Sequence, residues 1–193
     1  MSLSDWSDGA SVFLAGLAVL TLFVAWRQWQ EVVRRRRVDM YWKLFDVFES
    51  DQLRRSSLAF DEIEKRLGLE PVDGFVEHIP SDKDRERLSS TYWRIFYRAD
   101  RDSEDKQQDR LARARIRFFA ATGVLLEAGL VDRDLVFGLI GPALDVDRRL
   151  LDIIITANRS KHRFPTMFKE VYDVDKEYKR WKEGRQGAQL GVT

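Results

Sequence analysis

The sequence contains no cysteine. Disulfide bonds, a thiolate nucleophile and cysteine-ligated metal or iron–sulfur centres are therefore excluded, and the composition fits a reducing compartment. Proline and glycine are scarce as well, with four and eleven residues in a chain of 193. Because 34% of the residues are charged and they fall into patterns of helical period, we expect an all-α protein, a helical bundle rather than a β-sandwich or an α/β sheet.

Neither sign of charge prevails, since 33 Lys and Arg face 32 Asp and Glu. Nucleic-acid binding requires a net basic face, so we expect no general nucleic-acid binding, and any basic patch must be local. The chain length has room for one membrane anchor and one soluble domain of ordinary size.

An uncharged stretch runs from Gly9 to Trp26, and from Ala10 onward it is almost wholly apolar. At 1.5 Å per residue it forms roughly 26 Å of helix, close to the ~30 Å hydrocarbon core of a bilayer. A buried core helix would be amphipathic, and a signal peptide would have a positive start, whereas Asp5 and Asp8 precede this run. We therefore predict a transmembrane helix over 10–26, preceded by a short extracytoplasmic N-terminus over 1–9.

Basic residues follow this span. By the positive-inside rule the C-terminal side is cytoplasmic and the N-terminus faces out, so we expect a single-pass protein of a bacterial inner membrane. An alternative reading of the arginine run is a specific lipid or nucleic-acid site. The residues expected at the lipid headgroups and interfaces are Trp6, Trp26, Arg27, Trp29, Arg34, Arg35, Arg36 and Arg37.

Small side chains recur within the span at intervals of four and three residues, which places them on one helix face. Close helix–helix approach is possible there, so the anchor is a candidate for self-association. The residues of this face are Ser11, Ala15, Ala18, Leu22 and Ala25.

No proline or glycine interrupts the chain between Gly16 and Gly68. We therefore expect the anchor to continue as a juxtamembrane helix over 27–50, followed by a cytoplasmic helical domain over 51–183 and a disordered tail over 184–193. Within the domain, Ser50 and Ser81 are predicted N-caps, and Gly68 ends the first domain helix.

Further helices are expected in the second half of the chain. The wholly polar segment 100–110 predicts a solvated turn or helix end, and Gly129 and Asp132 predict a helix end and the next N-cap. Gly141 and Pro142 are predicted to separate two helices, and Pro165 to begin the last one.

The order of these features resembles a family of uncharacterised bacterial membrane-anchored proteins, a domain of unknown function, close to membrane proteins assigned to phage abortive infection. The matching residues are Trp29, Gln30, Asp39 and Tyr41, with the segments 118–131 and 144–159. The resemblance implies a cytoplasmic helical domain on a bacterial inner membrane and a role in phage defence. It supplies no catalytic residues.

A search for catalytic chemistry identifies no catalytic residues, no metal ligands and no cofactor. The only candidate acid–base groups at neutral pH, His78 and His162, stand in no recognisable motif, and zinc-protease and phosphate-loop patterns do not occur. The acidic residues around Glu64 suggest a metal-dependent nuclease only superficially, because that chemistry requires acids on adjoining strands and these fall on a predicted helix.

The densest basic cluster beyond the arginine run is the possible anion contact formed by Arg159, Lys161, His162 and Arg163. Cations at a helix C-terminus favour the helix dipole, which is the structural reading, whereas contact with headgroups, nucleotide or RNA is the functional one. The aromatic residues between Tyr92 and Tyr97 admit two readings as well, a ligand pocket and core packing.

These observations favour a membrane-anchored interaction or signalling module that is not an enzyme. More specifically, we expect a phage-defence effector that oligomerises through its anchor. Its partners would be the lipid bilayer and a second copy or another protein. Two alternatives stay open: a membrane-tethered enzyme acting on a phosphate-containing substrate, and an accessory subunit of a membrane complex.

Overall fold

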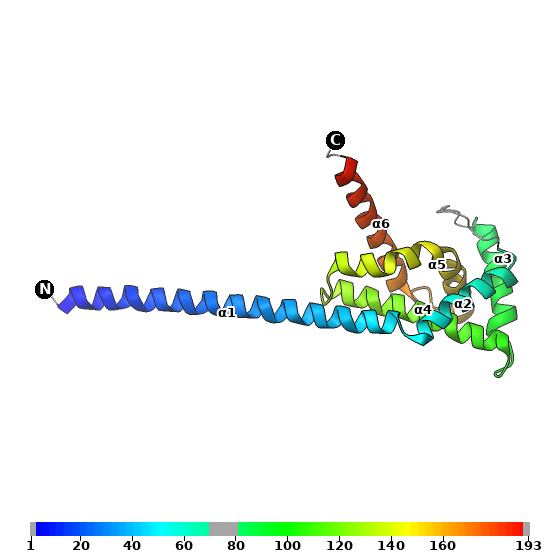
Figure 1. Ribbon diagram of the computed structural model, residues 1–193, viewed down its shortest axis with the longest axis horizontal. Helices are drawn as coiled ribbons and strands as arrows, with labels where there is room; N and C mark the ends of the chain where they lie inside the picture. Colours follow the sequence, from blue (N-terminus) through cyan, green and yellow to red (C-terminus); the bar gives the residue numbers. More distant parts are fainter. Residues whose placement is uncertain (1–2, 70–80, 191–193) are drawn as a thin grey trace.

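The protein is all-helical, as a computed structural model shows (Figure 1). The structure describes residues 3–69 and 81–190, with side chains over 20–69 and 81–186. The elements are α1 (Leu3–Phe48), α2 (Asp51–Arg66), α3 (Asp82–Tyr92), the π-helical segment η1 (Trp93–Tyr97), α4 (Glu104–Glu127), α5 (Arg133–His162) and α6 (Lys169–Leu190).

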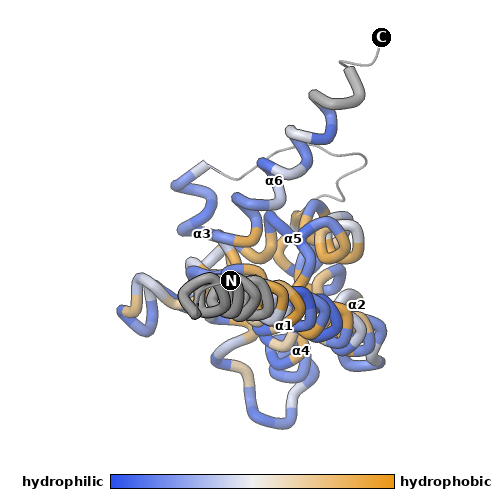
Figure 2. The backbone as a smooth tube through the Cα atoms, turned by 90° about the vertical axis from the view of Figure 1, so that its left-hand side faces the viewer, coloured by the Kyte–Doolittle hydropathy of each residue, from blue (hydrophilic) through white to orange (hydrophobic). Residues whose placement is uncertain are grey.

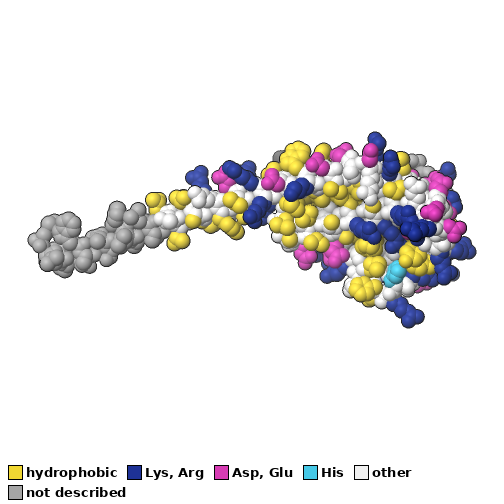
Figure 3. Space-filling model, turned by 90° about the horizontal axis from the view of Figure 1, so that it is seen from below, with side chains coloured by type: hydrophobic (Ala, Val, Ile, Leu, Met, Phe, Trp, Pro, Cys, Tyr) yellow, Lys and Arg dark blue, Asp and Glu magenta, His cyan; other side chains and the backbone are white. Residues whose placement is uncertain are grey.

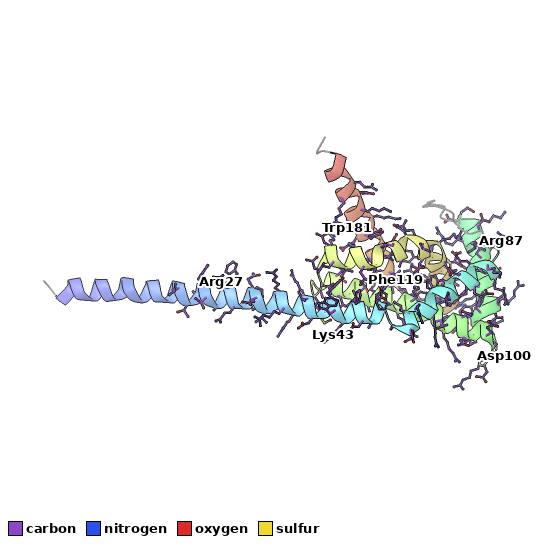
Figure 4. The ribbon with its side chains drawn as sticks, viewed as in Figure 1. Arg27, Lys43, Arg87, Asp100, Phe119 and Trp181 are labelled. Atoms are coloured by element: carbon purple, nitrogen blue, oxygen red, sulfur yellow. The ribbon has the colours of Figure 1, made fainter. Side chains whose placement is uncertain are left out.

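Helix α1 is a single continuous helix whose first half stands clear of the bundle (Figure 1). Arg27 lies on the free part, and Lys43 lies where α1 runs along the bundle (Figure 4). Contact with the bundle includes a hydrogen bond of 3.0 Å from Arg37 Nε to the Gly129 carbonyl oxygen. The expected continuation of the N-terminal helix over 27–50 is therefore present as far as Phe48.

The core lies between α2, α3, α4, α5 and α6, where apolar positions of the tube face one another (Figure 2). Helix α5 contributes the largest share, because apolar residues at helical spacing line both of its inward flanks. The largest fully buried side chains include Tyr92, Phe96, Phe119, Phe137, Ile63, Ile116, Ile140, Leu144, Leu150, Ile153, Ile154 and Ile155.

The helix ends agree with the predicted caps. Ser50, Ser81 and Asp132 each accept a hydrogen bond from a backbone N–H of the first turn that follows them. Gly68 and Gly129 both adopt positive φ directly after a helix, the conformation that glycine reaches without steric cost. The loop expected over 69–80 lies outside the described residues from 70 onward.

The predicted break at Gly141 and Pro142 is wrong, because α5 runs through both residues. Proline lacks the N–H that would bond the carbonyl four residues earlier, which here belongs to Gly138. Both Gly138 and Pro142 are exposed, so water reaches this side of the helix. The opposite side, with Ile140 and Leu144, is buried against the bundle, and packing there outweighs the local cost of the proline.

Two predictions for the C-terminal part are also corrected. The last helix begins at Lys169 rather than at Pro165, after a turn in which Phe168 has a φ of 58°. It continues through Gly184 to Leu190, where a disordered tail was expected from 184. The segment after Gly184 consists largely of good helix formers, so the helix extends beyond its packed part.

Among the side chains that the structure describes, which begin at Leu20, no helix carries an apolar run long enough to cross a bilayer. The predicted span over 10–26 falls largely outside these side chains. The same holds for the predicted interface and packing residues Trp6, Ser11, Ala15 and Ala18.

A buried ion pair crosses the core between α4 and α5. Arg115 Nε donates to Asp147 Oδ2, and the two side chains are 8% and 3% exposed. The guanidinium also lies over the rings of Phe60 and Phe119, at 5.5 and 5.8 Å from their centroids. Burial raises the pKa of the Asp147 carboxyl to about 6, and the neighbouring Arg115 offsets only part of that rise.

This raised pKa predicts a specific pH dependence. Between about pH 6 and pH 4 folded Asp147 binds a proton that the unfolded chain releases, so falling pH favours the folded state at this site. Relative to Asp147→Asn, which does not titrate, the free energy of unfolding of the wild type should rise by on the order of 2 kcal/mol from pH 7 to pH 4. Urea unfolding of both proteins at the two pH values measures the difference; a constant difference would contradict the assignment.

Helices α4 and α6 approach closely at Gly123. A Cβ atom at this position would lie 2.8 Å from the Glu170 carbonyl oxygen and 2.8 Å from Val174 Cγ2. Gly138 on α5, in contrast, has open space around the same position. The glycine at 123 is therefore required by the contact, whereas the one at 138 is not.

We expect Gly123→Ala to lower the free energy of unfolding by about 1–3 kcal/mol, because the backbone of α6 must move away. Gly138→Ala should raise it by about 0.5–1 kcal/mol, because alanine favours the helix and meets nothing. Thermal unfolding followed by circular dichroism compares the two variants. Equal shifts of the same sign would show that α4 and α6 are not packed in this way.

Candidate functional site

A cavity of about 460 Å³ lies between α3, α5 and α6. Arg85 comes from α3, residues between Leu144 and Arg159 come from α5, and residues between Val171 and Lys179 come from α6. Charged side chains and apolar ones both face it. Its lining comprises Arg85, Leu144, Arg148, Arg149, Leu151, Asp152, Ile155, Thr156, Arg159, Val171, Tyr172, Asp175 and Lys179.

Ion pairs hold several of the basic side chains in place. Arg85 Nε lies 2.6 Å from Asp152 Oδ2, although neither atom makes a well-aligned hydrogen bond. Arg148 Nε donates to Asp175 Oδ1 at 2.8 Å, and Lys179 Nζ lies 3.3 Å from Asp175 Oδ2. The two carboxylates thus fix the positions of three cations.

Arg159 is held differently from the other arginines of the cavity. Its Nε donates to the Met167 carbonyl oxygen at 2.8 Å, and its guanidinium carbon lies 4.7 Å from the centroid of the Tyr172 ring. Within the described part of the chain, no carboxylate lies at ion-pair distance from it. The contacts fix its geometry but leave its charge uncompensated.

Tyr172 is a hydrogen-bond donor in this site. Its hydroxyl donates to Asp152 Oδ1 at 2.8 Å. Burial, followed by the nearby Asp152 carboxylate, raises the pKa of the Tyr172 phenol above its ordinary value. The phenol therefore stays protonated at neutral pH and serves binding and positioning rather than proton abstraction.

The predicted basic cluster after the apolar part of α5 is only partly assembled into a site. Arg159 lines the cavity, whereas Lys161, His162 and Arg163 are exposed and do not line it. Arg163 adopts a left-handed φ of 53° and ends the helix. Lys161 and His162 lie in the last turn of α5, where the negative end of the helix dipole favours positive charge.

His162 packs against two aromatic rings of η1. Its ring lies edge-on to Trp93 and Tyr97, with centroid distances of 5.5 and 5.7 Å. Trp93 and Tyr97, four residues apart on η1, stack on each other with their centroids 3.6 Å apart.

Core packing, one of the two readings of the aromatic segment, holds for part of it. Tyr92 and Phe96 are fully buried and stack within the core at 5.4 Å. Trp93 and Tyr97 are half-buried at the surface, and Lys106 lies 4.4 Å and Arg113 4.6 Å from the Tyr97 ring. Core packing thus explains the inward face of α3 and η1. The outward face of η1 carries Trp93 and Tyr97, which form an aromatic and basic cluster with Lys106 and Arg113.

A buried carboxylate ties this cluster to the core. Asp109 is 1% exposed, accepts a 2.6 Å hydrogen bond from the Tyr92 hydroxyl and pairs with Arg113 at 3.0 Å and Lys106 at 3.3 Å. The solvated character predicted for 100–110 is wrong at this residue. Lys106 and Arg113 lie one turn away on the same helix, α4, whereas Tyr92 comes from α3. The local composition gives no sign of this tertiary partner.

The sequence alone does not single out most residues of the cavity. The chain does carry a signal, because Arg148, Asp152 and Arg159 are spaced by four and seven residues and fall on one face of α5. Asp175 and Lys179 on α6 follow the same rule. The sequence does not show that these two faces, together with Arg85, surround one cavity.

Of the predicted interface residues, those with described side chains are exposed on the free part of α1 or at its junction with the bundle. Trp26 and Trp29 are 57% and 60% exposed, and Leu22 of the proposed packing face is 70% exposed. Arg35 pairs with Glu31 at 2.7 Å on the surface. The remaining members, Ala25, Arg27, Arg34, Arg36 and Arg37, are exposed as well.

No family model, curated protein or solved structure matches this chain.

Proposed function

We propose that this protein is a membrane-anchored helical interaction module of a bacterial inner membrane, with its N-terminus outside and its bundle in the cytoplasm. The observation that carries the proposal is the uncharged stretch from Gly9 to Trp26. It belongs to a helix that stands clear of the bundle (Figure 1). A solitary apolar helix in water would be costly, and a bilayer removes that cost.

The exposed apolar side chains at the described end of this stretch support the proposal. Leu20, Leu22 and Phe23 are 59%, 70% and 54% exposed, and hydrophobic side chains precede the basic ones along α1 in Figure 3. Such a concentration of exposed apolar surface marks an interaction site.

The arginine run has the spacing expected for headgroup attraction. Arg34 lies eight residues after Trp26, or about 12 Å along the helix. The headgroup layer extends about 5–8 Å beyond the hydrocarbon on each side, so this run would lie within a Debye length of ~8–10 Å from the lipid phosphates. At that distance each arginine contributes up to about 1 kcal/mol of attraction to anionic lipid.

The bundle fits a role in binding rather than catalysis. His162 packs against the rings of Trp93 and Tyr97, and the Tyr172 phenol is held protonated against Asp152. We infer that the bundle senses a partner and that α1, continuous from the bundle to the anchor, carries the response to the membrane. The resemblance in the sequence adds phage defence to this proposal as its biological setting.

The absence of cysteine makes a direct test of topology possible, because every introduced thiol is unique. We expect a membrane-impermeant maleimide to label Ser4→Cys in intact spheroplasts and to label Ser160→Cys, on an exposed position, only after lysis. Labelling of Ser160→Cys in intact spheroplasts would contradict the proposed orientation.

Self-association of the anchor is tested by thiol crosslinking in native membranes. Ala25→Cys lies on the proposed packing face, and Phe23→Cys lies about 200° around the helix from it. We expect oxidation to produce a crosslinked dimer of the first variant and little of the second. Equal yields of dimer, or monomer in both variants, would contradict self-association through this helix face but not the membrane anchor itself.

A further inference from the structure

We propose that the cavity between α3, α5 and α6 binds a small organic molecule that carries a phosphate group, with Arg159 as its principal phosphate contact. The site would give the bundle a ligand of defined chemistry. It depends only on the geometry of the bundle and not on the membrane anchor.

Cationic side chains outnumber carboxylates around this cavity. The lining holds five of the former and two of the latter, namely Arg85, Arg148, Arg149, Arg159 and Lys179 against Asp152 and Asp175. Carboxylates behind the lining offset part of the excess, since Glu64 pairs with Arg149 and Asp145 with Arg148. With those two included, five cations face four carboxylates, so one positive charge is in excess, and Arg159 is the cation without a carboxylate at ion-pair distance among the described residues.

Arg159 has the geometry of a ready-made phosphate contact. Its Nε is occupied by the Met167 carbonyl oxygen and its face is stacked on Tyr172, so the side chain is already ordered. The two terminal nitrogens make no hydrogen bond to any described residue, and both can donate to one phosphate in parallel. A guanidinium fixed in this way loses little entropy when the anion binds.

The rest of the lining determines the kind of molecule that fits. Leu144, Leu151, Ile155 and Val171 form an apolar floor and are almost fully buried, and the cavity of about 460 Å³ is larger than inorganic phosphate alone would fill. Asp152 and Asp175 add acceptors for hydroxyl or amino groups. The volume lies within the ~300–1,000 Å³ typical of small-molecule sites. A phosphate monoester fits both the basic and the apolar part of the lining, because it joins a phosphate group to an organic body.

The test uses the full-length protein in mild detergent and measures the shift of its thermal unfolding midpoint. The probes are adenosine monophosphate, adenosine as the matched compound without phosphate, inorganic phosphate, and dihexanoyl phosphatidic acid as a soluble lipid headgroup. Binding to the folded state alone raises the midpoint by mass action. We expect adenosine monophosphate or dihexanoyl phosphatidic acid to raise it more than inorganic phosphate does, and adenosine to have no effect.

Arg159→Gln should weaken the binding of the active probe by roughly tenfold or more, because a charge-assisted contact is lost. Arg163→Gln is the matched control, since Arg163 is exposed at the end of the same helix and does not line the cavity. If Arg159→Gln does not fold, Lys179→Gln replaces it, because that side chain is 36% exposed at the rim.

The pattern of responses separates the sources of the phosphate. A shift with adenosine monophosphate that Arg159→Gln abolishes supports a soluble phosphate ester, and the same pattern with dihexanoyl phosphatidic acid supports a lipid headgroup. No shift of the wild type with any phosphate probe, or equal losses in Arg159→Gln and Arg163→Gln, would overturn the assignment.

Discussion

Replacing Arg115 with leucine should lower the free energy of unfolding by about 3–5 kcal/mol, the cost of leaving one member of a buried ion pair without its partner. Asp147, 3% exposed, would then lack its counterion inside the core. The guanidinium also bonds the Leu53 carbonyl oxygen at 3.5 Å, so α2 loses a contact at the same time. Urea unfolding of the detergent-solubilised protein, followed by circular dichroism, measures the change.

Two further variants isolate the cause. Arg54→Leu breaks an exposed pair with Asp51, whose side chains are 78% and 75% exposed, and should cost no more than about 1 kcal/mol. The double variant Arg115→Leu with Asp147→Leu removes both charges and should recover most of the lost stability, because no charge stays buried alone. Equal losses in Arg115→Leu and Arg54→Leu would show that the core is not organised around this pair.

Replacing Leu17 and Leu20 with arginine should release the protein from the membrane. Each arginine near the centre of a transmembrane helix costs about 2.5–3.5 kcal/mol of insertion free energy, so the pair opposes insertion by about 5–7 kcal/mol. Most of the protein should then move from the membrane pellet to the supernatant. Quantitative immunoblotting of both fractions gives the ratio.

The matched control introduces two arginines at exposed apolar positions of the bundle. Leu58 and Val146 are 66% and 71% exposed, so arginine is tolerated at both positions. Leu58→Arg with Val146→Arg should fractionate as the wild type does. If both double variants stay in the pellet, attachment does not depend on the apolar stretch.

Local signals allowed much of the fold to be predicted. Ser50, Ser81 and Asp132 cap their helices as expected, because an N-cap depends on the few residues around it. Gly68 and Gly129 are predictable for the same reason, since a left-handed residue after a helix favours glycine. These features require no knowledge of the tertiary structure.

The errors arise where tertiary packing overrides a local rule. Pro142 is a strong local reason to end a helix, yet the buried side of α5 continues past it. Asp109 lies in a wholly polar segment and is nevertheless buried, because the end of α3 packs against α4 there and the Tyr92 hydroxyl donates to its carboxylate. Local composition predicts neither the continuation of α5 past Pro142 nor the burial of Asp109.

The candidate site could be predicted only in part for a related reason. The basic cluster in the sequence points to Arg159, but its three other members lie outside the cavity. Arg85, 74 positions away in the sequence, contributes to the same cavity only because α3 packs against α5. The Ser89 hydroxyl, which donates to the Ile153 carbonyl oxygen at 3.0 Å, is part of that contact and has no sequence signature.

The central claim is that the N-terminal helix holds this protein in a bilayer, and sedimentation of the wild-type protein tests it most directly. Cells producing the full chain are lysed without detergent, the membranes are washed with alkaline carbonate, and the fractions are separated by ultracentrifugation. We predict that the protein stays in the washed pellet and enters the supernatant only when detergent is added. Recovery of the wild-type protein in the detergent-free supernatant would contradict the anchor and the topology built on it.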